Sequence, residues 1–285
     1  MTVAGGPVTM RRLIDDAAEQ LAAAGVGSPR VDAELLAAHV AGTDRGLVGF
    51  TVPDTDFAQR FGALVARRAQ RVPLQHLTGT AAFGPVTVHV GPGVFVPRPE
   101  TEALLEWALA QPLPAEPVIV DLCTGSGALA LALATARPRA RVVAVDDSPD
   151  ALRYARRNAE GTSVEVVSAD VTSADLLTEL DGAVDLLVTN PPYIPTDVWR
   201  ALDPQVRDHE PELALHGGSD GLDAIRAIAQ GAAAALAPAG WLLLEHHHDQ
   251  SEAAVELLRQ SGLNNAAAHL DLEGVKRFAC AQRPT

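Results

Sequence analysis

Val118-Ile119-Val120-Asp121-Leu122-Cys123-Thr124-Gly125-Ser126-Gly127 is a short apolar strand that runs into a glycine turn, and the residues after it continue as a helix. Glycine lets the backbone approach a ligand closely because it has no Cβ. The next strand, Val142 to Val145, ends at Asp146, which lies 19 residues after Gly127. That spacing suits an acidic residue that binds ribose hydroxyls. The segment therefore predicts a site for a nucleotide-containing cofactor.

Two cofactors fit this turn. The run from Gly125 to Ala130 matches the G-x-G-x-x-A pattern of NAD-binding proteins, but the short pattern does not exclude S-adenosylmethionine. Asp121 favours S-adenosylmethionine, since a carboxylate just before the turn would repel a pyrophosphate but can hold the ammonium group of a methionine moiety. The alternative role of Asp121 is to compensate the dipole of the following helix.

From residue 117 onwards, predicted strands alternate with predicted helices. The strands are expected at 117–122, 141–146, 164–168, 184–189 and 240–246, and the helices at 127–136, 150–159, 221–236 and 250–261. Two further strands, near 266–272 and 277–282, are expected to form an antiparallel edge. The alternation predicts an α/β fold with a doubly wound, mostly parallel seven-stranded sheet. The stretch 194–219 is expected to be a loop over the site.

The N-terminal part follows a different pattern. Apolar residues at helical spacing between residues 10 and 71 predict a small helical domain, and alternating valines at 86–90 predict a hairpin. We expect a helical domain over 1–80, a hairpin linker over 81–98 and a cofactor-binding domain over 99–285. Four arginines of the helical part are most simply a solvated helix face, or else a docking patch for an acidic partner: Arg60, Arg67, Arg68 and Arg71.

Successive strands of the predicted sheet end in polar residues. In a doubly wound sheet, ligands gather at the carboxyl ends of the strands. Asp146, Asp170 and Asn190 each follow one of these strands, so they are expected on one rim. Asp170 can accept a hydrogen bond from an adenine amino group, and Val171 beside it is included in the predicted cofactor site. Capping of a loop is the alternative role for Asp170.

Asn190-Pro191-Pro192-Tyr193 stands at the end of the fourth predicted strand. Two consecutive prolines fix two φ angles and remove two backbone donors, and the residue before each proline is kept out of the helical region. The segment is therefore a stiff ledge that presents carbonyl oxygens, an Asn side chain and an aromatic ring. It can accept hydrogen bonds from an –NH2 group, which predicts chemistry on an amide or amino nitrogen. The alternative is a rigid proline turn with a packed tyrosine.

Composition narrows the cellular setting and the partners. The chain has 285 residues and two cysteines, with no long apolar run, no apparent secretory signal and no disulfide framework, so we expect a cytoplasmic protein. Its net charge of −14 lies entirely in residues 81–285, because residues 1–80 hold eight Arg and eight Asp or Glu. An acidic body is a poor match for a nucleic-acid backbone, so neither nucleic acid nor a membrane is an expected partner.

Two other groups of residues are assigned structural roles. His246-His247-His248 resembles a metal-binding run, but neighbouring residues of a strand point to opposite faces, so we expect a polar strand end and no metal. Cys123 has no histidine near it in the sequence to activate it as a nucleophile, which favours a small packing residue.

The chain resembles the HemK/PrmC protein-glutamine methyltransferases over almost its whole length. Five segments carry the resemblance: Pro73–Gly79, Phe95–Glu102, Asp121–Gly127, Asn190–Tyr193 and Leu244–His246. Phe95–Glu102 and Asn190–Tyr193 together are much more specific than either alone. The resemblance implies a class I S-adenosylmethionine-dependent methyltransferase. Its substrate would be the glutamine of the Gly-Gly-Gln tripeptide in class 1 peptide chain release factors.

The resemblance also implies residue roles. The glycine turn and Asp146 would bind cofactor, the Asn190–Tyr193 ledge would bind the glutamine side chain, and residues 1–80 would help to recognise the release factor. With the carboxylates above, the predicted cofactor-binding residues are Asp121, Cys123, Thr124, Gly125, Ser126, Gly127, Asp146, Asp170, Val171 and Asn190. The predicted substrate-binding residues are Phe95, Arg98, Asn190, Pro191, Pro192 and Tyr193, of which Asn190, Pro191 and Tyr193 are expected to be catalytic.

Two positions depart from the family pattern. Cys123 stands where the turn commonly has another glycine, and its backbone is expected to serve if φ is negative there. His247-His248 follows Glu245-His246 where the family often has glycine. Neither change touches the groups assigned to chemistry.

Four other functions are weighed against this one. The ledge suits the exocyclic amino group of adenine in DNA or RNA equally well, although the acidic body argues against it. A glutamine methyltransferase acting on a ribosomal protein would need the same residues. An NAD-dependent oxidoreductase leaves the ledge unexplained, and an intact cofactor rim disfavours a non-catalytic adaptor that binds release factor through residues 1–80.

Overall fold

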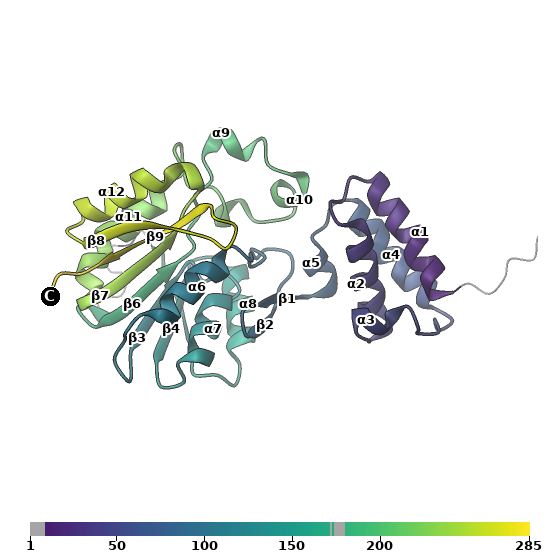
Figure 1. The fold of residues 1–285 in the computed structure, drawn as a ribbon, viewed down its shortest axis with the longest axis horizontal. Coiled ribbons are helices and arrows are strands. Elements are labelled where there is room, and N and C mark those ends of the chain that lie inside the picture. Colours follow the sequence, from purple (N-terminus) through teal and green to yellow (C-terminus); the bar gives the residue numbers. More distant parts are fainter. Residues whose placement is uncertain (1–8, 172, 174–179) are drawn as a thin grey trace, which may run out of the picture. The chain divides into compact units, whose positions relative to one another are not determined.

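The computed structural model describes residues 9–171, 173 and 180–285 of the chain (Figure 1). Contacts divide these residues into two compact units. One unit holds the residues up to Gly79 together with Pro204–His209, and the other holds Thr80–Asp203 and Glu210–Thr285. The hairpin groups with the second unit. Within the described ranges, no helix combines the length and the apolar character that a membrane span needs.

The first unit is built from short helices. They are α1 (Met10–Ala23), α2 (Pro29–Ala41), α3 (Arg45–Val48), α4 (Phe57–Ala69), α5 (Leu74–Thr78) and, from later in the chain, α10 (Pro204–Arg207). The apolar faces of α1, α2 and α4 bury Ile14, Leu36 and Phe61 in a common core. The segment with α10 joins this unit, where the ring Nε2 of His209 lies 3.1 Å from the carbonyl oxygen of Gln70.

Arg68 is buried, which corrects the expectation of a solvated arginine face. Its Nε donates to Asp32 Oδ2 at 2.7 Å, and both side chains are less than a tenth exposed. Removing one partner of such a pair leaves the other charge buried without compensation and destabilises the folded protein by about 3–5 kcal/mol. Arg60, by contrast, pairs with Asp54 on the surface. Arg68 therefore holds the helical unit together and is not available to an acidic partner.

The second unit contains the predicted seven-stranded sheet, in the order β5-β4-β3-β6-β7-β9-β8. Its strands are β3 (Val118–Leu122), β4 (Arg141–Asp146), β5 (Glu165–Ser168), β6 (Val184–Thr189), β7 (Leu236–Glu245), β8 (Asn264–Leu270) and β9 (Lys276–Gln282). Strands β3 to β7 pair in parallel, and β9 runs antiparallel to both β7 and β8. The chain order reverses around β3, between β4 and β6, which is where ligands bind in open α/β sheets.

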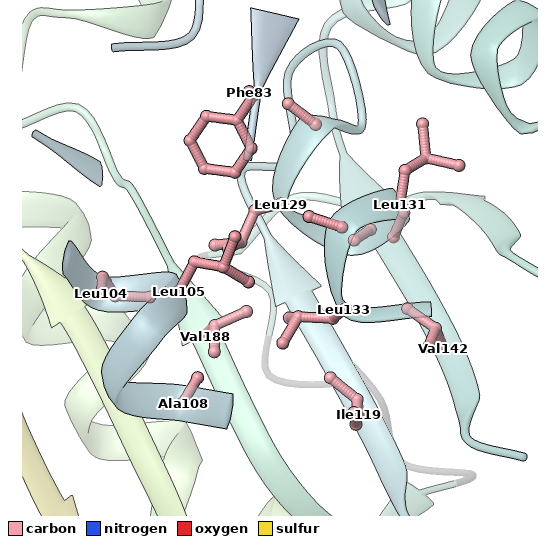
Figure 2. Packing of buried hydrophobic residues seen from close by; sticks show 14 of the residues in the cluster. Phe83, Leu104, Leu105, Ala108, Ile119, Leu129, Leu131, Leu133, Val142 and Val188 are labelled. Atoms are coloured by element: carbon pink, nitrogen blue, oxygen red, sulfur yellow. The ribbon is translucent and has the colours of Figure 1, made fainter. Parts of the chain in front are cut away.

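Helices cover both faces of this sheet. One hydrophobic core includes residues of α6 (Thr101–Ala110), α7 (Ala128–Ala136) and α8 (Pro149–Ala159), and the other includes residues of α11 (Asp223–Ala235) and α12 (Ser251–Gln260). The hairpin of β1 (Thr80–Phe83) and β2 (Val86–His89) joins the first core. Figure 2 shows Phe83 of β1 and Leu105 of α6 converging on Leu129 of α7. The hairpin is thus part of the packed unit that positions the glycine turn.

The stretch 194–219, expected to be a loop, contains short helical segments. They are α9 (Thr196–Trp199), α10 and a 3-10 turn, η2 (Glu212–Ala214). Its two ends are tied together by backbone hydrogen bonds. Ile194 donates to Leu215 at 2.7 Å, and Gly217 donates to Ile194 at 2.9 Å.

Candidate active site

A cavity of about 470 Å³ opens at the carboxyl ends of β3, β4 and β6. Eleven of the predicted site residues line it: Phe95, Asp121, Cys123, Thr124, Gly125, Ser126, Asp146, Asp170, Val171, Asn190 and Pro192. Among the described residues, four other predicted positions are not part of the lining: Arg98, Gly127, Pro191 and Tyr193. Residues between 211 and 218 complete the wall, so the expectation that the stretch 194–219 borders the site is confirmed for its C-terminal part.

The glycine turn repeatedly uses the left-handed backbone region. Gly125 has φ +58°, and a Cβ built there would meet no atom within 4 Å, so its missing side chain leaves open space for a ligand. Gly127 has φ +83°, and its Cβ would lie 3.6 Å from the backbone of Ala155. Gly127 therefore serves the start of α7 and its packing rather than the cavity.

Cys123 has φ +56°, so the condition under which its backbone was expected to replace a glycine, a negative φ, is not met. A residue with a Cβ in this region costs roughly 1–2 kcal/mol relative to ordinary backbone. Burial raises the pKa of the Cys123 thiol, and nearby Asp146 raises it further. The side chain therefore stays a neutral thiol, in agreement with a non-nucleophilic role.

Asp121 is a buried carboxylate at the end of β3. Its Oδ2 accepts hydrogen bonds from Thr124 Oγ1 at 2.6 Å and from the backbone N–H of Ala130 at 3.1 Å. Burial outweighs these bonds and raises the pKa of Asp121 to about 7. Both bonds end on one oxygen, so Oδ1 is not needed to brace the turn. Asp121 steadies the start of α7 through these bonds and also lines the cavity.

Asp146 joins the end of β4 to the glycine turn. Its Oδ2 accepts from the backbone N–H of Gly125 at 2.8 Å, and its Oδ1 accepts from that of Ser148 at 3.0 Å. Burial raises the pKa of Asp146 above its ordinary value. A carboxylate offers about four lone-pair sites, so these two bonds leave capacity for ligand hydroxyls.

The Asn190–Tyr193 ledge follows β6 directly, and its two polar side chains are held from behind. Asn190 Nδ2 donates to Thr101 Oγ1 at 3.3 Å, and the Tyr193 hydroxyl donates to Glu245 Oε1 at 2.9 Å. The Tyr193 carbonyl in turn accepts from Gln250 Nε2 at 2.9 Å. The tyrosine therefore points to Glu245, and the expected packing of its ring on a substrate is not supported by this geometry.

Arg98 supports the wall of the cavity from outside. Its guanidinium stacks over the ring of Phe95, with 4.7 Å between Cζ and the ring centroid, and it pairs with Glu210. Glu210 is buried and precedes the residues of η2 that line the cavity. Arg98 thus joins the segment before α6 to the stretch that closes the site.

Sequence reasoning assigned no chemistry to three residues that hold the site: Thr101, Glu245 and Gln250. Thr101 and Glu245 lie within the segments that carried the family resemblance, which was the available signal. Thr101 Oγ1 donates to Glu245 Oε2 at 2.6 Å, and this bond joins residues 144 positions apart. Such a contact has no local sequence pattern.

The histidine run follows the end of β7 at Glu245, and its members differ in burial. His246 is fully buried, with Nδ1 2.8 Å from the carbonyl oxygen of His247, so it is not the polar strand end that was expected. His247, His248 and Asp249 each offer one ligand atom within 4.8 Å of the others. The side chains of His248 and Asp249 are exposed, and their Nε2 and Oδ1 atoms are 3.2 Å apart. A polar contact between two exposed neighbouring side chains accounts for this distance.

Comparison with known proteins identifies the family. Residues 12–79 match the model of the PrmC N-terminal domain, and residues 86–200 match that of the methyltransferase small domain. The release factor glutamine methyltransferase of Mycolicibacterium smegmatis is 59% identical over 276 residues, which cover 96% of this chain and 98% of the relative. The chain belongs to the release factor glutamine methyltransferase family. The resemblance predicted from the sequence is confirmed.

More distant members of the release factor glutamine methyltransferase family match just as fully. The protein of this name from Mycobacterium tuberculosis is 55% identical, covering 97% of this chain and 92% of the relative. That from Streptomyces coelicolor is 49% identical, covering 95% and 96%. A crystal structure of a methyltransferase from Pyrococcus furiosus aligns with a TM-score of 0.52 and 17% identity over 70% of this chain and 89% of its own, which supports the predicted fold.

Proposed function

We propose that this enzyme transfers a methyl group from S-adenosylmethionine to the side-chain amide nitrogen of the glutamine in the Gly-Gly-Gln motif of class 1 peptide chain release factors. One observation carries the proposal. Asn190 and Pro192, from a ledge suited to an –NH2 group, line the same cavity as the glycine turn and Asp146. The relatives that match almost the whole chain carry the name of this activity.

The cavity fits S-adenosylmethionine. Gly125 leaves open space in the turn, and buried carboxylates border the cavity where an ammonium group and ribose hydroxyls can be bound. We assign the ammonium to Asp121, the ribose hydroxyls to Asp146, and the adenine amino group to Asp170. Cys123 to Ser126 and Val171 supply the rest of this wall. S-adenosylmethionine supplies a methyl group on a sulfonium, which is already activated for displacement.

The enzyme's own task is to orient a weak nucleophile. The lone pair of a glutamine amide nitrogen is delocalised into its carbonyl group. We assign Asn190 Oδ1 and the Pro191 carbonyl as acceptors for the two amide hydrogens, which aims the nitrogen and favours its pyramidalisation. No strong base is placed in this scheme, and the surplus proton leaves to water. Orientation of this kind can contribute up to roughly 7–11 kcal/mol.

Tyr193 receives a revised role. Burial raises the pKa of its hydroxyl well above the ordinary value, and Glu245 raises it further, so the hydroxyl remains a donor. It donates to Glu245 and does not line the cavity. We assign Tyr193 to holding the ledge in place. Asn190, which lines the cavity, contacts the substrate amide, and the Pro191 side chain lies outside the lining while its carbonyl is the second proposed acceptor.

The helical unit is assigned to substrate recognition. Residues 12–79 match the PrmC N-terminal domain, and residues 1–80 carry no net charge, unlike the acidic remainder. We propose that residues 1–80 bind the release factor and that residues 99–285 perform methyl transfer. Cytoplasmic location remains a prediction.

The test is methylation of a defined substrate. The purified enzyme is incubated with labelled S-adenosylmethionine and a class 1 release factor, and the labelled residue is mapped by mass spectrometry. We expect one methyl group on the glutamine of Gly-Gly-Gln and none on a release factor with that glutamine changed to alanine. Parallel reactions contain adenine-bearing DNA, RNA and ribosomal proteins. Label on any of these, with none on the release factor, would refute the assignment.

A further inference from the structure

Four residues in the wall of the cavity and behind it form a continuous hydrogen-bonded network. Asn190 donates from Nδ2 to Thr101 Oγ1 at 3.3 Å, Thr101 donates to Glu245 Oε2 at 2.6 Å, and Tyr193 donates to Glu245 Oε1 at 2.9 Å. Thr101 and Glu245 are buried, at 5% and 1% exposure. Thr101 and Asn190 line the cavity, whereas Glu245 lies behind them.

Three elements of the second unit bring this chain together. Strands β6 and β7 pair in parallel with Thr189 opposite Leu244, so Asn190 and Glu245 are the next residues along neighbouring strands. Thr101 is the first residue of α6, whose apolar side packs in the core against the sheet. The contact is therefore a property of the packed sheet and not of any one segment.

The chain has a direction. An ionised carboxylate can only accept hydrogen bonds, and a threonine hydroxyl has one hydrogen to donate. The short bond to Glu245 takes the hydrogen of Thr101, so Thr101 Oγ1 can act towards Asn190 only as an acceptor. Asn190 must then face Thr101 with its NH2 group. Its Oδ1 is turned away from Thr101 and is free to accept from a ligand.

We infer that Glu245 and Thr101 are positioning residues, which hold the Asn190 side chain with its oxygen towards the substrate and thereby make the site select an –NH2 group. This inference rests on the proposed methyl transfer to glutamine and deepens it. With the opposite orientation, Asn190 would present N–H donors to the substrate nitrogen, and the amide hydrogens of glutamine would lose an acceptor. An inverted Asn190 would favour a carbonyl or carboxylate group instead.

The charge on Glu245 decides which way the hydrogen bonds from Asn190 through Thr101 to Glu245 run. These hydrogen bonds are therefore sensitive to pH. The groups that act on it are Arg277 of β9, Glu100 before α6, and Tyr193 of the ledge, with His246 next to it in the chain. Burial raises the pKa of Glu245, whereas Thr101, Tyr193 and Arg277 lower it. Burial is the larger effect, and the resulting pKa is about 7. Arg277 is itself paired with Asp271 at 3.1 Å.

Protonation of Glu245 changes which groups of the hydrogen-bonded network donate and which accept. A protonated Glu245 has a hydrogen of its own to donate to Thr101, which releases the threonine hydroxyl to donate to Asn190. The orientation of Asn190 is then no longer imposed. Because ionised Glu245 is the ordering form, we expect kcat at saturating S-adenosylmethionine and release factor to fall as the pH drops through about 7.

The test compares variants that keep or remove the threonine hydroxyl. Thr101→Val removes it with little change of shape, and Thr101→Ser retains it. We expect kcat to fall roughly 10²-fold in Thr101→Val, as for other misplaced reacting groups, and to recover largely in Thr101→Ser. S-adenosylmethionine affinity, measured by calorimetry, should change little in both. Thr135→Val is the matched control, since Thr135 donates only within α7, to the Leu131 carbonyl at 2.8 Å.

A second variant keeps the proposal testable if Thr101→Val folds poorly. Glu245→Gln cannot titrate, so the fall of kcat near pH 7 should disappear in it. Wild-type kcat in folded Thr101→Val, or an unchanged pH limb in Glu245→Gln, would overturn the inference. A wild-type enzyme that leaves release factor unmethylated would instead refute the proposed function, and this inference would fall with it.

Discussion

Two buried carboxylates brace the cavity in different ways. Asp121 lines it and bonds to partners three and nine residues away in the chain. Glu245 acts from behind and bonds to partners 144 and 52 residues away. Burial raises the pKa of both to about 7. Burial therefore acts alike on two carboxylates, one of which braces the turn that we assign to the cofactor, while the other braces the ledge that we assign to the substrate.

This difference separates two parts of catalysis. The local brace shapes a turn that is complete within one strand–turn–helix segment, so its loss should weaken cofactor binding. The long-range brace depends on the pairing of β6 with β7 and on the placement of α6, so its loss should disturb the orientation of the substrate nitrogen. Cofactor affinity and kcat are the measurements that tell the two apart.

The largest expected effect tests the substrate side. Asn190→Ala removes the acceptor held by the long-range brace, so we expect kcat for release factor methylation to fall by at least about 10²-fold. S-adenosylmethionine affinity by calorimetry should change far less. Asn264→Ala, on the exposed start of β8, is the control and should behave as wild type. Near-wild-type methylation by Asn190→Ala would sink the proposed mechanism.

The next prediction concerns stability and compares the two carboxylates directly. Burial raises the pKa of Asp121 and Glu245 from 3.8 and 4.5 to about 7, so the folded protein keeps protons that the unfolded chain releases between those values. Stability from these groups is present at acidic pH and is lost as the pH rises to about 7. We expect Asp121→Asn and Glu245→Gln each to reduce this loss by an amount on the order of a few kcal/mol.

Urea unfolding of the cofactor-free enzyme at several values between about pH 5 and about pH 8 measures this effect. The buried Arg68–Asp32 pair of the helical unit is the same in all variants, so any contribution it makes to the pH dependence of unfolding is common to them. Identical pH dependence in the wild type and both variants would contradict burial as the origin of the shifts. A similar change in both variants, with different effects on cofactor affinity and kcat, would sharpen the comparison.

A smaller effect is expected at the rim of the cofactor side. Asp146→Ala removes a carboxylate that lines the cavity and holds the Gly125 backbone. Loss of charge-assisted hydrogen bonds of this kind should weaken S-adenosylmethionine binding roughly tenfold or more by calorimetry. The exposed Asp181 provides a control, since Asp181→Ala should leave the affinity unchanged. Unaltered binding in Asp146→Ala would refute the ribose assignment.

The smallest expected effect concerns the backbone of the glycine turn. Cys123→Gly removes the strain of a residue with a Cβ at positive φ, so we expect the free energy of unfolding to rise by at most about 1 kcal/mol. Cys280→Gly is the matched substitution in buried β9, outside the positive-φ region, and should destabilise. Denaturant unfolding of the two variants checks the opposite signs. Equal destabilisation would show that packing of the Cys123 side chain outweighs its backbone strain.

Much of the fold and of the cofactor side could be predicted from the sequence. The alternation of strands and helices places Asp146, Asp170 and Asn190 at strand ends, and the structure brings all three to one cavity. Glycines in the turn signalled its backbone geometry. The expected strand at 240–246 instead begins at Leu236, since Leu236 also pairs with Val184 of β6.

The substrate side could be predicted only in part. The two prolines indicated a stiff ledge, but nothing near Tyr193 indicated that its hydroxyl would point to Glu245. Arg98 was assigned to the substrate, yet it pairs with Glu210, more than a hundred residues later. In both cases the partner lies on another element, and its identity depends on how the elements pack.

The sequence by itself determined the strand–turn–helix segment, the order of the polar strand ends and the family, because backbone preferences and side-chain periodicity act over a few residues. The tertiary structure alone decided which polar atom of the Asn190 side chain, its oxygen or its nitrogen, faces Thr101. That choice depends on the register between β6 and β7 and on the place where α6 begins, which together bring Thr101 and Glu245 to Asn190. A hydrogen bond is short and directional, so such a contact exists only after the whole sheet has packed.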